Sequence, residues 1–287
     1  MTSHPDHKAI LHQRQLAASR QRGQNFLVHR HTAERIVELA GVCASDRIVE
    51  LGVGFGALTG PLAAKAAGVI GLEIDSGIVA WHREERDLPD NVDLRHEDLL
   101  KADFPALAEE CGGRLKIVAN LPYSVSNPLL FKLLENREVM ESAVLMLQKE
   151  VGQRLTAAPG SKEYGILTVL LNGCARVEKL LEVGPGQFHP RPKVDSVVVG
   201  ITFHPRPERA TQLPPHDHAL LRKVVKAAFQ QRRKTLLNSL SASGLAATGK
   251  ERLPALLKQA GIDPQVRPER LTVEDFVRIT NLLSGMA

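Results

Sequence analysis

The stretch that decides the fold, residues 47–60, reads RIVELGVGFGALTG. A β-branched run passes into a glycine-rich turn, and the apolar spacing after the turn is that of a helix. Glycines let the backbone approach a ligand closely, and the first turn of the following helix carries unpaired N–H groups that suit an anion. The stretch therefore predicts a strand over 47–51, a helix over 57–66 and a nucleotide site at Gly52 and Gly54.

Acidic residues lie at the ends of the next two predicted strands. The strand over 69–74 contains Glu73, 21 residues after Gly52, where a carboxylate accepts hydrogen bonds from both hydroxyls of a ribose. The strand over 92–96 is followed by Asp98, which we expect to receive the adenine amino group of a cofactor. This spacing fits both NAD and S-adenosylmethionine, so the glycine motif leaves the two cofactors open.

Residues 117–123 read IVANLPY and narrow that choice. An exocyclic adenine amine is a poor nucleophile, and hydrogen-bond acceptors must hold its two protons while the nitrogen becomes tetrahedral. Asn120 and a backbone carbonyl beside Pro122 are suited to this, and the Tyr123 ring is suited to stacking on a flipped base. A strand that ends in a plain proline turn is the alternative. Hydride transfer has no evident use for such a loop, which favours S-adenosylmethionine.

With these motifs the chain resembles a known family, the ribosomal RNA adenine dimethyltransferases, and within it the small-subunit (16S rRNA) branch. The matching segments extend over nearly the whole chain and are together highly specific. They are GQNFL (23–27), ELGVGFGALT (50–59), EID (73–75), ED (97–98), NLPY (120–123), MLQKE (146–150), FHPRPKVDS (188–196) and FQQRRKT (229–235).

The resemblance implies an S-adenosylmethionine-dependent enzyme of ribosome biogenesis. It would make N6,N6-dimethyladenosine at two adjacent adenosines in the 3′-terminal hairpin loop of 16S rRNA, within an immature small ribosomal subunit. The catalytic residues that the resemblance implies are Asn120, Leu121, Pro122, Tyr123 and Phe188. The cofactor-binding residues that we expect are Asn25, Leu27, Gly52, Gly54, Glu73, Asp98 and Asn120. Ser124 and Asn127 depart from the family's more frequent residues and bear on the shape of the target pocket.

Three of these residues also have a structural interpretation. Asn25 and Leu27 precede the first predicted helix, where a cap with a hydrophobic staple explains them equally well. Phe188 is either a core aromatic or a rigid platform for the target base opposite Tyr123, in a proline-flanked loop that overhangs the site. The resemblance favours cofactor contact for the first two and stacking for the third.

Basic charge is concentrated at two flanks of the chain. The net charge is +5, to which residues 1–30 contribute +4 and residues 205–240 contribute +6, so the remainder is acidic. Arg232, Arg233 and Lys234 begin a predicted helix, where cations are unfavourable to the helix dipole, and we expect them to bind RNA phosphates. A solvated helix face is the ordinary alternative.

Strand and helix patterns alternate along most of the chain, which predicts an α/β fold with a mostly parallel sheet. We expect a Rossmann-like methyltransferase sheet with a small C-terminal all-helical domain. The predicted parts are a basic flexible N-terminal arm (1–22), a catalytic domain (23–204), a proline-rich linker (205–215) and a helical RNA-binding domain (216–287). Further strands are predicted over 115–120, 142–148, 175–183 and 196–203, and further helices over 31–41, 76–86, 127–135, 149–157, 164–174, 216–229, 232–242, 250–260 and 272–284.

The remaining composition excludes several classes of protein. The three cysteines are widely spaced and the histidines lack companions at ligand spacing, so we expect no metal site. No apolar run is long enough for a membrane span, and we expect a cytoplasmic monomer without membrane contact. The acid-free stretch 8–22 is the one segment with the composition of an organellar transit peptide.

Three other functions share part of this pattern. A large-subunit rRNA adenine methyltransferase of the antibiotic-resistance type would share the catalytic motifs, but the segment 229–235 and the long helical tail favour the small-subunit branch. A DNA adenine methyltransferase is a weaker alternative. A non-catalytic RNA-binding assembly factor could keep the same fold, although an intact cofactor motif argues against it.

Overall fold

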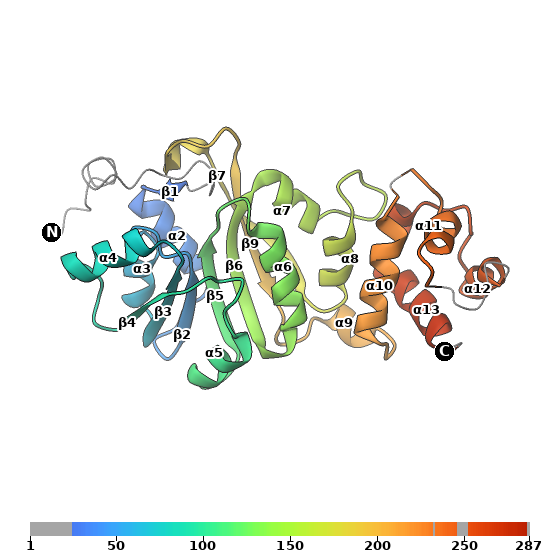
Figure 1. Cartoon of the computed structure of the whole chain (residues 1–287), viewed down its shortest axis with the longest axis horizontal. Helices are drawn as coiled ribbons and strands as arrows, with labels where there is room; N and C mark the ends of the chain where they lie inside the picture. The colour runs from blue at the N-terminus through green and yellow to red at the C-terminus, as the bar shows by residue number, and fades with distance from the viewer. Residues whose placement is uncertain (1–24, 232, 246–251, 286–287) are drawn as a thin grey trace. The chain divides into compact units, whose positions relative to one another are not determined.

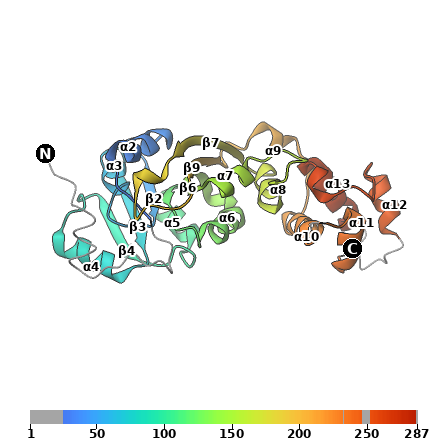
Figure 2. The same ribbon diagram turned by 90° about the horizontal axis from the view of Figure 1, so that it is seen from above.

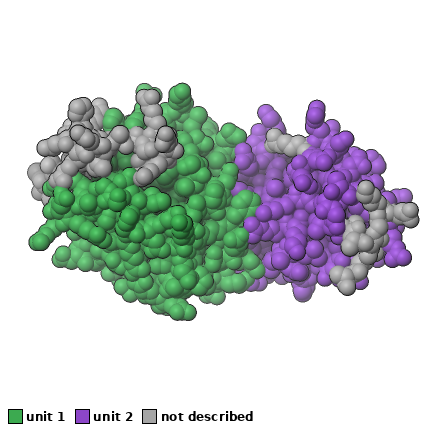
Figure 3. Space-filling view, viewed as in Figure 1, with its two compact units in different colours: residues 1–152, 177–205 green, residues 153–176, 206–287 purple. Residues whose placement is uncertain are grey.

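The computed structural model describes residues 25–231, 233–245 and 252–285 (Figure 1). The chain forms two compact units (Figure 3). Among the described residues, the first unit comprises 25–152 and 177–205, and the second comprises 153–176 and the described part of 206–285. The predicted arm over 1–22 lies outside the described residues.

The first unit is built on a seven-stranded sheet of order β4-β3-β2-β5-β6-β9-β7. The strands from β4 to β6 pair in parallel, and β9 pairs antiparallel to β6. This arrangement confirms the predicted α/β fold class. The strands are β2 (Arg47–Leu51), β3 (Gly68–Glu73), β4 (Val92–His96), β5 (Leu115–Asn120), β6 (Met140–Gln148), β7 (Arg176–Val183) and β9 (Ser196–Thr202).

Helices cover both faces of this sheet. Figure 2 shows α2 and α3 on one side of it and α5 and α6 on the other. Carboxylate caps define two of the helix starts: Asp75 accepts from the Gly77 and Ile78 N–H groups at α4, and Asp103 accepts from Ala106 N–H at α5. The helices are α2 (Arg30–Leu39), α3 (Thr59–Ala63), α4 (Ser76–Glu85), α5 (Phe104–Glu110), α6 (Ser126–Glu135) and α7 (Lys149–Leu155).

Two short elements were not predicted from the sequence and bring distant segments together. β1 (Phe26–Leu27) pairs antiparallel with β8 (Phe188–His189), with Leu27 in register with Phe188. Phe188 is buried in a hydrophobic cluster with Leu27, Ile36 and Val198. The segment around Phe188, predicted as a loop, is therefore tied to the N-terminal segment by backbone pairing.

The second unit is helical, as predicted for the tail, and α10 lies at its centre. α10 packs against α8, α11 and α13, and Val224 and Val225 are fully buried on it. The helices are α8 (Ile166–Asn172), α9 (Glu208–Gln212), α10 (His218–Phe229), α11 (Leu236–Ala242), α12 (Leu253–Gln259) and α13 (Val273–Ser284).

The division into units differs from the predicted domain boundaries at residues 153–176 and in the predicted linker over 205–215, which belongs to the second unit from residue 206 on. Residues 153–176, placed by the sequence in the catalytic domain, group with the C-terminal helices. The reason is that α8 has an apolar surface, including Val169 and Leu171, and packs on α10 and α13. The predicted linker over 205–215 also contains a short helix, α9.

Candidate active site

A cavity of about 270 Å³ lies at the carboxyl ends of the parallel strands of the first unit. Parallel sheets place ligand sites at this edge because the strand-to-helix loops meet there. Glycine-turn residues, β1 and the ends of β3 and β5 contribute to the wall. All the residues predicted to bind the cofactor line it: Asn25, Leu27, Gly52, Gly54, Glu73, Asp98 and Asn120.

The glycine turn after β2 needs glycine at the positions where the sequence has it. Gly52, Gly54 and Gly56 have φ angles of 82°, 55° and 77°, which side chains with a Cβ disfavour. A Cβ at Gly54 would also lie 3.2 Å from the Phe26 ring. The turn thus presents backbone to the cavity at a distance that a side chain would prevent.

Glu73, at the end of β3, is held in place by backbone donors. Its Oε2 accepts from Gly54 N–H at 2.9 Å and its Oε1 accepts from Asp75 N–H at 2.8 Å. Burial raises the pKa of this carboxyl, and the two backbone hydrogen bonds oppose that shift. Each oxygen keeps a further lone pair with which to accept a hydroxyl proton.

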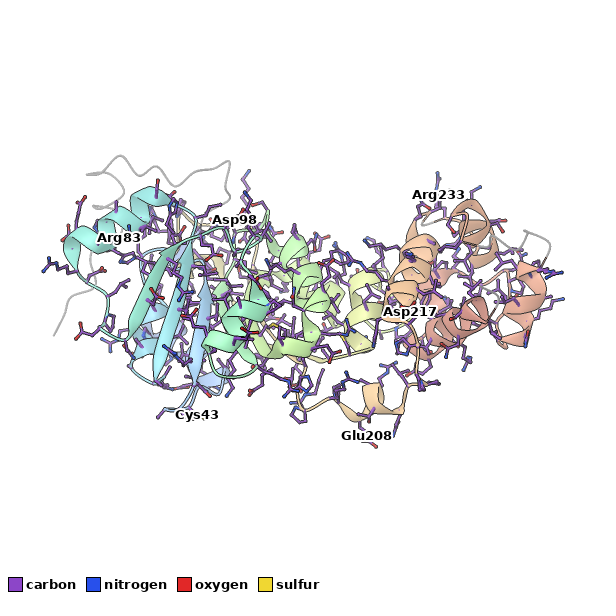
Figure 4. The ribbon with its side chains drawn as sticks, turned by 60° about the horizontal axis from the view of Figure 1, so that its bottom comes forward. Cys43, Arg83, Asp98, Glu208, Asp217 and Arg233 are labelled. Carbon is purple, nitrogen blue, oxygen red and sulfur yellow. The ribbon has the colours of Figure 1, made fainter. Side chains whose placement is uncertain are left out.

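Asp98, which is labelled in Figure 4, and two apolar side chains form the part of the cavity wall next to β4. Asp98 Oδ1 accepts from Leu100 N–H at 2.9 Å, which fixes the loop that carries the carboxylate. Ile74, half exposed although large and apolar, and Leu99 also line the cavity. An apolar wall beside a carboxylate acceptor suits a purine ring that carries an amino group.

Glu50 is a cavity residue that the sequence reasoning missed. It is 1% exposed, and its Oε2 has no hydrogen-bond partner among the described residues. Burial raises the pKa of its carboxyl to about 8, the Thr59 hydroxyl partly offsets this, and the Glu73 carboxylate adds to it. A carboxylate in an otherwise apolar strand was the signal available in the sequence.

The unpartnered Oε2 of Glu50 fits the cofactor that the motifs predict. A buried acceptor without a donor is costly, and a ligand that brings a cationic N–H group would satisfy it. S-adenosylmethionine carries an ammonium and a sulfonium charge, an adenine and a ribose. The wall formed by Glu50, Glu73 and Asp98 offers an acceptor for each of the donor groups.

Asn120 lies where β5 ends and is oriented by a contact across the cavity wall. Its Nδ2 donates to the Asn25 carbonyl oxygen at 3.3 Å. The side-chain Oδ1 is left as an acceptor without a partner in the described part of the chain. The carbonyl of Pro122 accepts from Val125 N–H at 3.1 Å and from the Ser126 hydroxyl at 3.5 Å, so the Leu121 carbonyl is the better candidate for the second acceptor.

The two predicted stacking residues have different surroundings. Tyr123 is half-buried, and its hydroxyl is buried without a hydrogen-bond partner in the residues that the structure describes. Phe188 is 6% exposed and belongs to the core cluster described above. Neither Tyr123 nor Phe188 is part of the cavity wall, and the same holds for Leu121, which is 3% exposed.

The basic segment of the second unit lies between α10 and α11. Arg233 and Lys234 are exposed, and Arg233 projects from the helices in Figure 4. Arg232 lies outside the described residues. The helix expected over 232–242 begins only at Leu236, because Thr235 caps it by accepting from Asn238 N–H. The cations therefore precede the helix.

Neither a metal cluster nor a membrane span is found in the described ranges. No group of three or more His, Cys, Asp or Glu side chains within them is placed to hold a metal ion. Likewise, none of the helices there has both the length and the apolar character needed to cross a membrane.

Comparison with known proteins places the chain in a family. The model of the ribosomal RNA adenine dimethylase family matches residues 16–284. The chain belongs to that family. This confirms the resemblance seen in the motifs, the class of enzyme and its cofactor, S-adenosylmethionine, in place of NAD.

Relatives within the ribosomal RNA adenine dimethylase family match over nearly full length. The chain is 49% identical to ribosomal RNA small subunit methyltransferase A of Desulfotalea psychrophila, with 98% of this chain and 97% of the relative covered. It is 43% identical to the protein of the same name from Geobacter metallireducens, with 92% and 94% covered.

Two solved structures share the fold over most of the chain. A dimethyladenosine transferase from Plasmodium falciparum has a TM-score of 0.71 and 26% identity, with 88% of this chain and 95% of that chain covered. The 23S rRNA methyltransferase ErmE has a TM-score of 0.66 and 25% identity, with 91% and 100% covered.

Proposed function

We propose that this adenine dimethyltransferase methylates N6 of two adjacent adenosines, twice each, in the 3′-terminal hairpin loop of 16S rRNA. The observation that carries the proposal is the cavity whose wall joins Glu73 and Asp98 to Asn120. The curated relatives named above are small-subunit methyltransferases, which supports small-subunit rRNA as the substrate. We further propose a cytoplasmic monomer that acts on an immature subunit.

The cofactor half of the site binds by hydrogen bonding and charge. When bound, S-adenosylmethionine supplies an electrophilic methyl group on a cationic sulfur. Glu73 would accept from the ribose hydroxyls and Asp98 from the adenine amine, while Glu50 would accept from a cationic N–H group. The glycine turn admits the ligand to backbone distance, and Asn25 and Leu27 close the wall beside it.

The target half of the site acts on the attacking amine. Asn120 Oδ1 and the Leu121 carbonyl would accept the two N6 protons, which directs the nitrogen lone pair toward the methyl group. Both acceptors are fixed by the end of β5. No strong general base is required, because the amine becomes acidic only after methylation and then loses its proton to a weak acceptor or to solvent.

Tyr123 would stack on the flipped adenine, and its unpartnered hydroxyl would gain a partner at that step. Phe188 has the same proposed role from the other side. Its ring is buried in the cluster with Leu27, so stacking requires that the ribbon of β1 and β8 shift to expose it.

A large-subunit substrate is the second candidate, because ErmE matches over 91% of this chain. Methyl transfer from labelled cofactor to immature small subunits, naked 16S rRNA, 23S rRNA and duplex DNA separates the candidates. We expect label in small subunits, at two adjacent adenosines of the 3′-terminal loop. Label in 23S rRNA alone would assign the enzyme to the other branch, and no transfer to any substrate would favour a non-catalytic assembly role.

A further inference from the structure

His82, on α4, packs against the glycine turn but does not line the cavity. Its side chain is 1% exposed. Nε2 lies 2.8 Å from the Gly54 carbonyl oxygen, and Nδ1 lies 2.7 Å from Asp87 Oδ1. A Cβ at Gly56 would lie 3.6 Å from Cε1 of this ring. The imidazole is therefore in contact with the turn and hydrogen-bonded at both nitrogens.

Both partners of the His82 ring are hydrogen-bond acceptors. A carbonyl oxygen only accepts, and an ionised carboxylate only accepts. A neutral imidazole has one N–H group, so it would direct a lone pair at one of the two oxygens. The imidazolium ion has two N–H groups and satisfies both.

The Gly54 residue is consequently held on both of its backbone polar groups. Its N–H donates to Glu73 Oε2, on β3, and its C=O accepts from His82, on α4. Both side chains are buried. Because Gly54 also has a positive φ angle, these two hydrogen bonds together set the orientation of the part of the turn that the cofactor meets.

The charges around His82 come from three elements. Asp87, from the segment after α4, contacts the ring and is 31% exposed. Glu73, on β3, lies on the other side of Gly54, and residues 52–58 of the turn carry no charge. Along α4 and its C-cap, residues 83–86 are exposed.

We propose that His82 is a positioning residue whose Nε2–H group donates to the Gly54 carbonyl and thereby fixes the cofactor-binding turn. Affinity for S-adenosylmethionine then depends on a hydrogen-bond donor at this position, although the ring does not touch the ligand. The proposal rests on the cofactor site described under the proposed function.

Calorimetry of S-adenosylmethionine binding to the full chain tests this. His82→Leu removes the donor and should lower affinity about tenfold. His82→Gln keeps an N–H group that can donate to the Gly54 carbonyl, so it should retain most of the wild-type affinity.

Two further variants complete the calorimetric test. Asp87→Asn removes the carboxylate that holds the ring at Nδ1 and should lower affinity less than His82→Leu does. Asp90→Asn, an exposed aspartate in the same segment, is the matched control and should leave affinity unchanged. Equal losses of affinity in His82→Leu and His82→Gln, or no loss in His82→Leu, would overturn the proposal, whereas a wild type that binds no cofactor would overturn the proposed function.

Discussion

The two halves of the active site differ in how completely the protein alone determines them. In the cofactor half, Glu73 and Asp98 already accept hydrogen bonds from backbone N–H groups, and three positive-φ glycines shape the turn. In the target half, Asn120 is oriented by Asn25, but the Tyr123 hydroxyl is buried without a partner in the described chain and Phe188 is packed in the core. We infer that the cofactor site is preorganised, whereas the base site is completed when RNA binds.

The largest expected effect tests the acceptor role in the target half. Asn120→Ala removes an acceptor whose hydrogen bond strengthens as N6 becomes tetrahedral, and losing one such preorganised group costs on the order of 10²–10³ in rate. Single-turnover methylation with saturating RNA and cofactor measures the chemical step. RNA affinity should stay near the wild-type value.

Stacking variants provide the contrast with Asn120. Tyr123→Ala and Phe188→Ala should act mainly on placement of the base, with about 1–3 kcal/mol lost per stacked ring. A near-normal rate for Asn120→Ala would make Asn120 a turn residue. A Phe188→Ala variant that loses stability but not base placement would make Phe188 a core residue only.

The next effect tests the cofactor half at Glu73. Glu73→Ala removes charge-assisted hydrogen bonds worth about 1.5–3 kcal/mol each, so calorimetry should show S-adenosylmethionine affinity lower by at least about tenfold. Glu73→Gln, which keeps the shape and one acceptor oxygen, should fall between wild type and alanine. An unchanged affinity in the alanine variant, or tight NAD binding by the wild type, would refute the assignment of this wall.

The buried Glu50 carboxyl should lower the stability of the protein at neutral pH, which is the energetic cost of the preorganised cofactor half. The pKa of this carboxyl is about 8 in the folded protein, above the ordinary value of 4.5, so the unfolded chain releases this proton at lower pH. The protonated Glu50 side chain therefore makes its full contribution to the free energy of unfolding below about pH 4.5, and this contribution is lost progressively as pH rises toward about 8. Glu50→Gln does not titrate, so the variant should not lose stability in this way.

Thermal unfolding of Glu50→Gln and wild type across this pH range measures the difference. The variant should exceed the wild-type Tm by a gap that widens from about pH 5 to about pH 8 and reaches at least about 2–4 °C. Saturating cofactor should narrow the gap, since it gives the wild-type carboxylate a partner. A gap independent of pH would mean that Glu50 does not titrate in this range.

The sequence predicted the cofactor half more completely than the target half, for a physical reason. Gly52, Glu73 and Asp98 follow strands, and the ends of parallel strands meet at one edge, so spacing along the chain gives position in space. β1 and β8 are two-residue strands separated by 160 residues of sequence, and strands this short have no hydrophobic periodicity from which their pairing could be predicted. The burial of Phe188 depends on that pairing, so it could not be predicted from the residues around Phe188.

The structure differs from the sequence-based prediction in two further features, and only one of them has a recognisable signal in the sequence. α5 begins at an Asp103 cap with a proline in its first turn, a recognisable helix start that the sequence reading passed over. The grouping of α8 with the C-terminal helices had no such signal, because an apolar helix face does not specify which neighbour covers it.

The smallest expected effect extends the comparison to the second unit, where Arg233 and Lys234 are exposed and precede α11. If they contact rRNA phosphates, each contact releases counterions, and the double alanine variant should lower the salt slope of RNA binding by about 0.7–0.9 per lost contact. Chemistry at saturating RNA should be unchanged, because neither residue belongs to the active site. Arg252 and Lys258, two other exposed cations of this unit, provide the charge-matched double alanine control. If both double variants lower the salt slope equally, RNA binding depends on net charge alone. If neither variant lowers the salt slope, Arg233 and Lys234 face solvent in the complex and the RNA contact lies elsewhere.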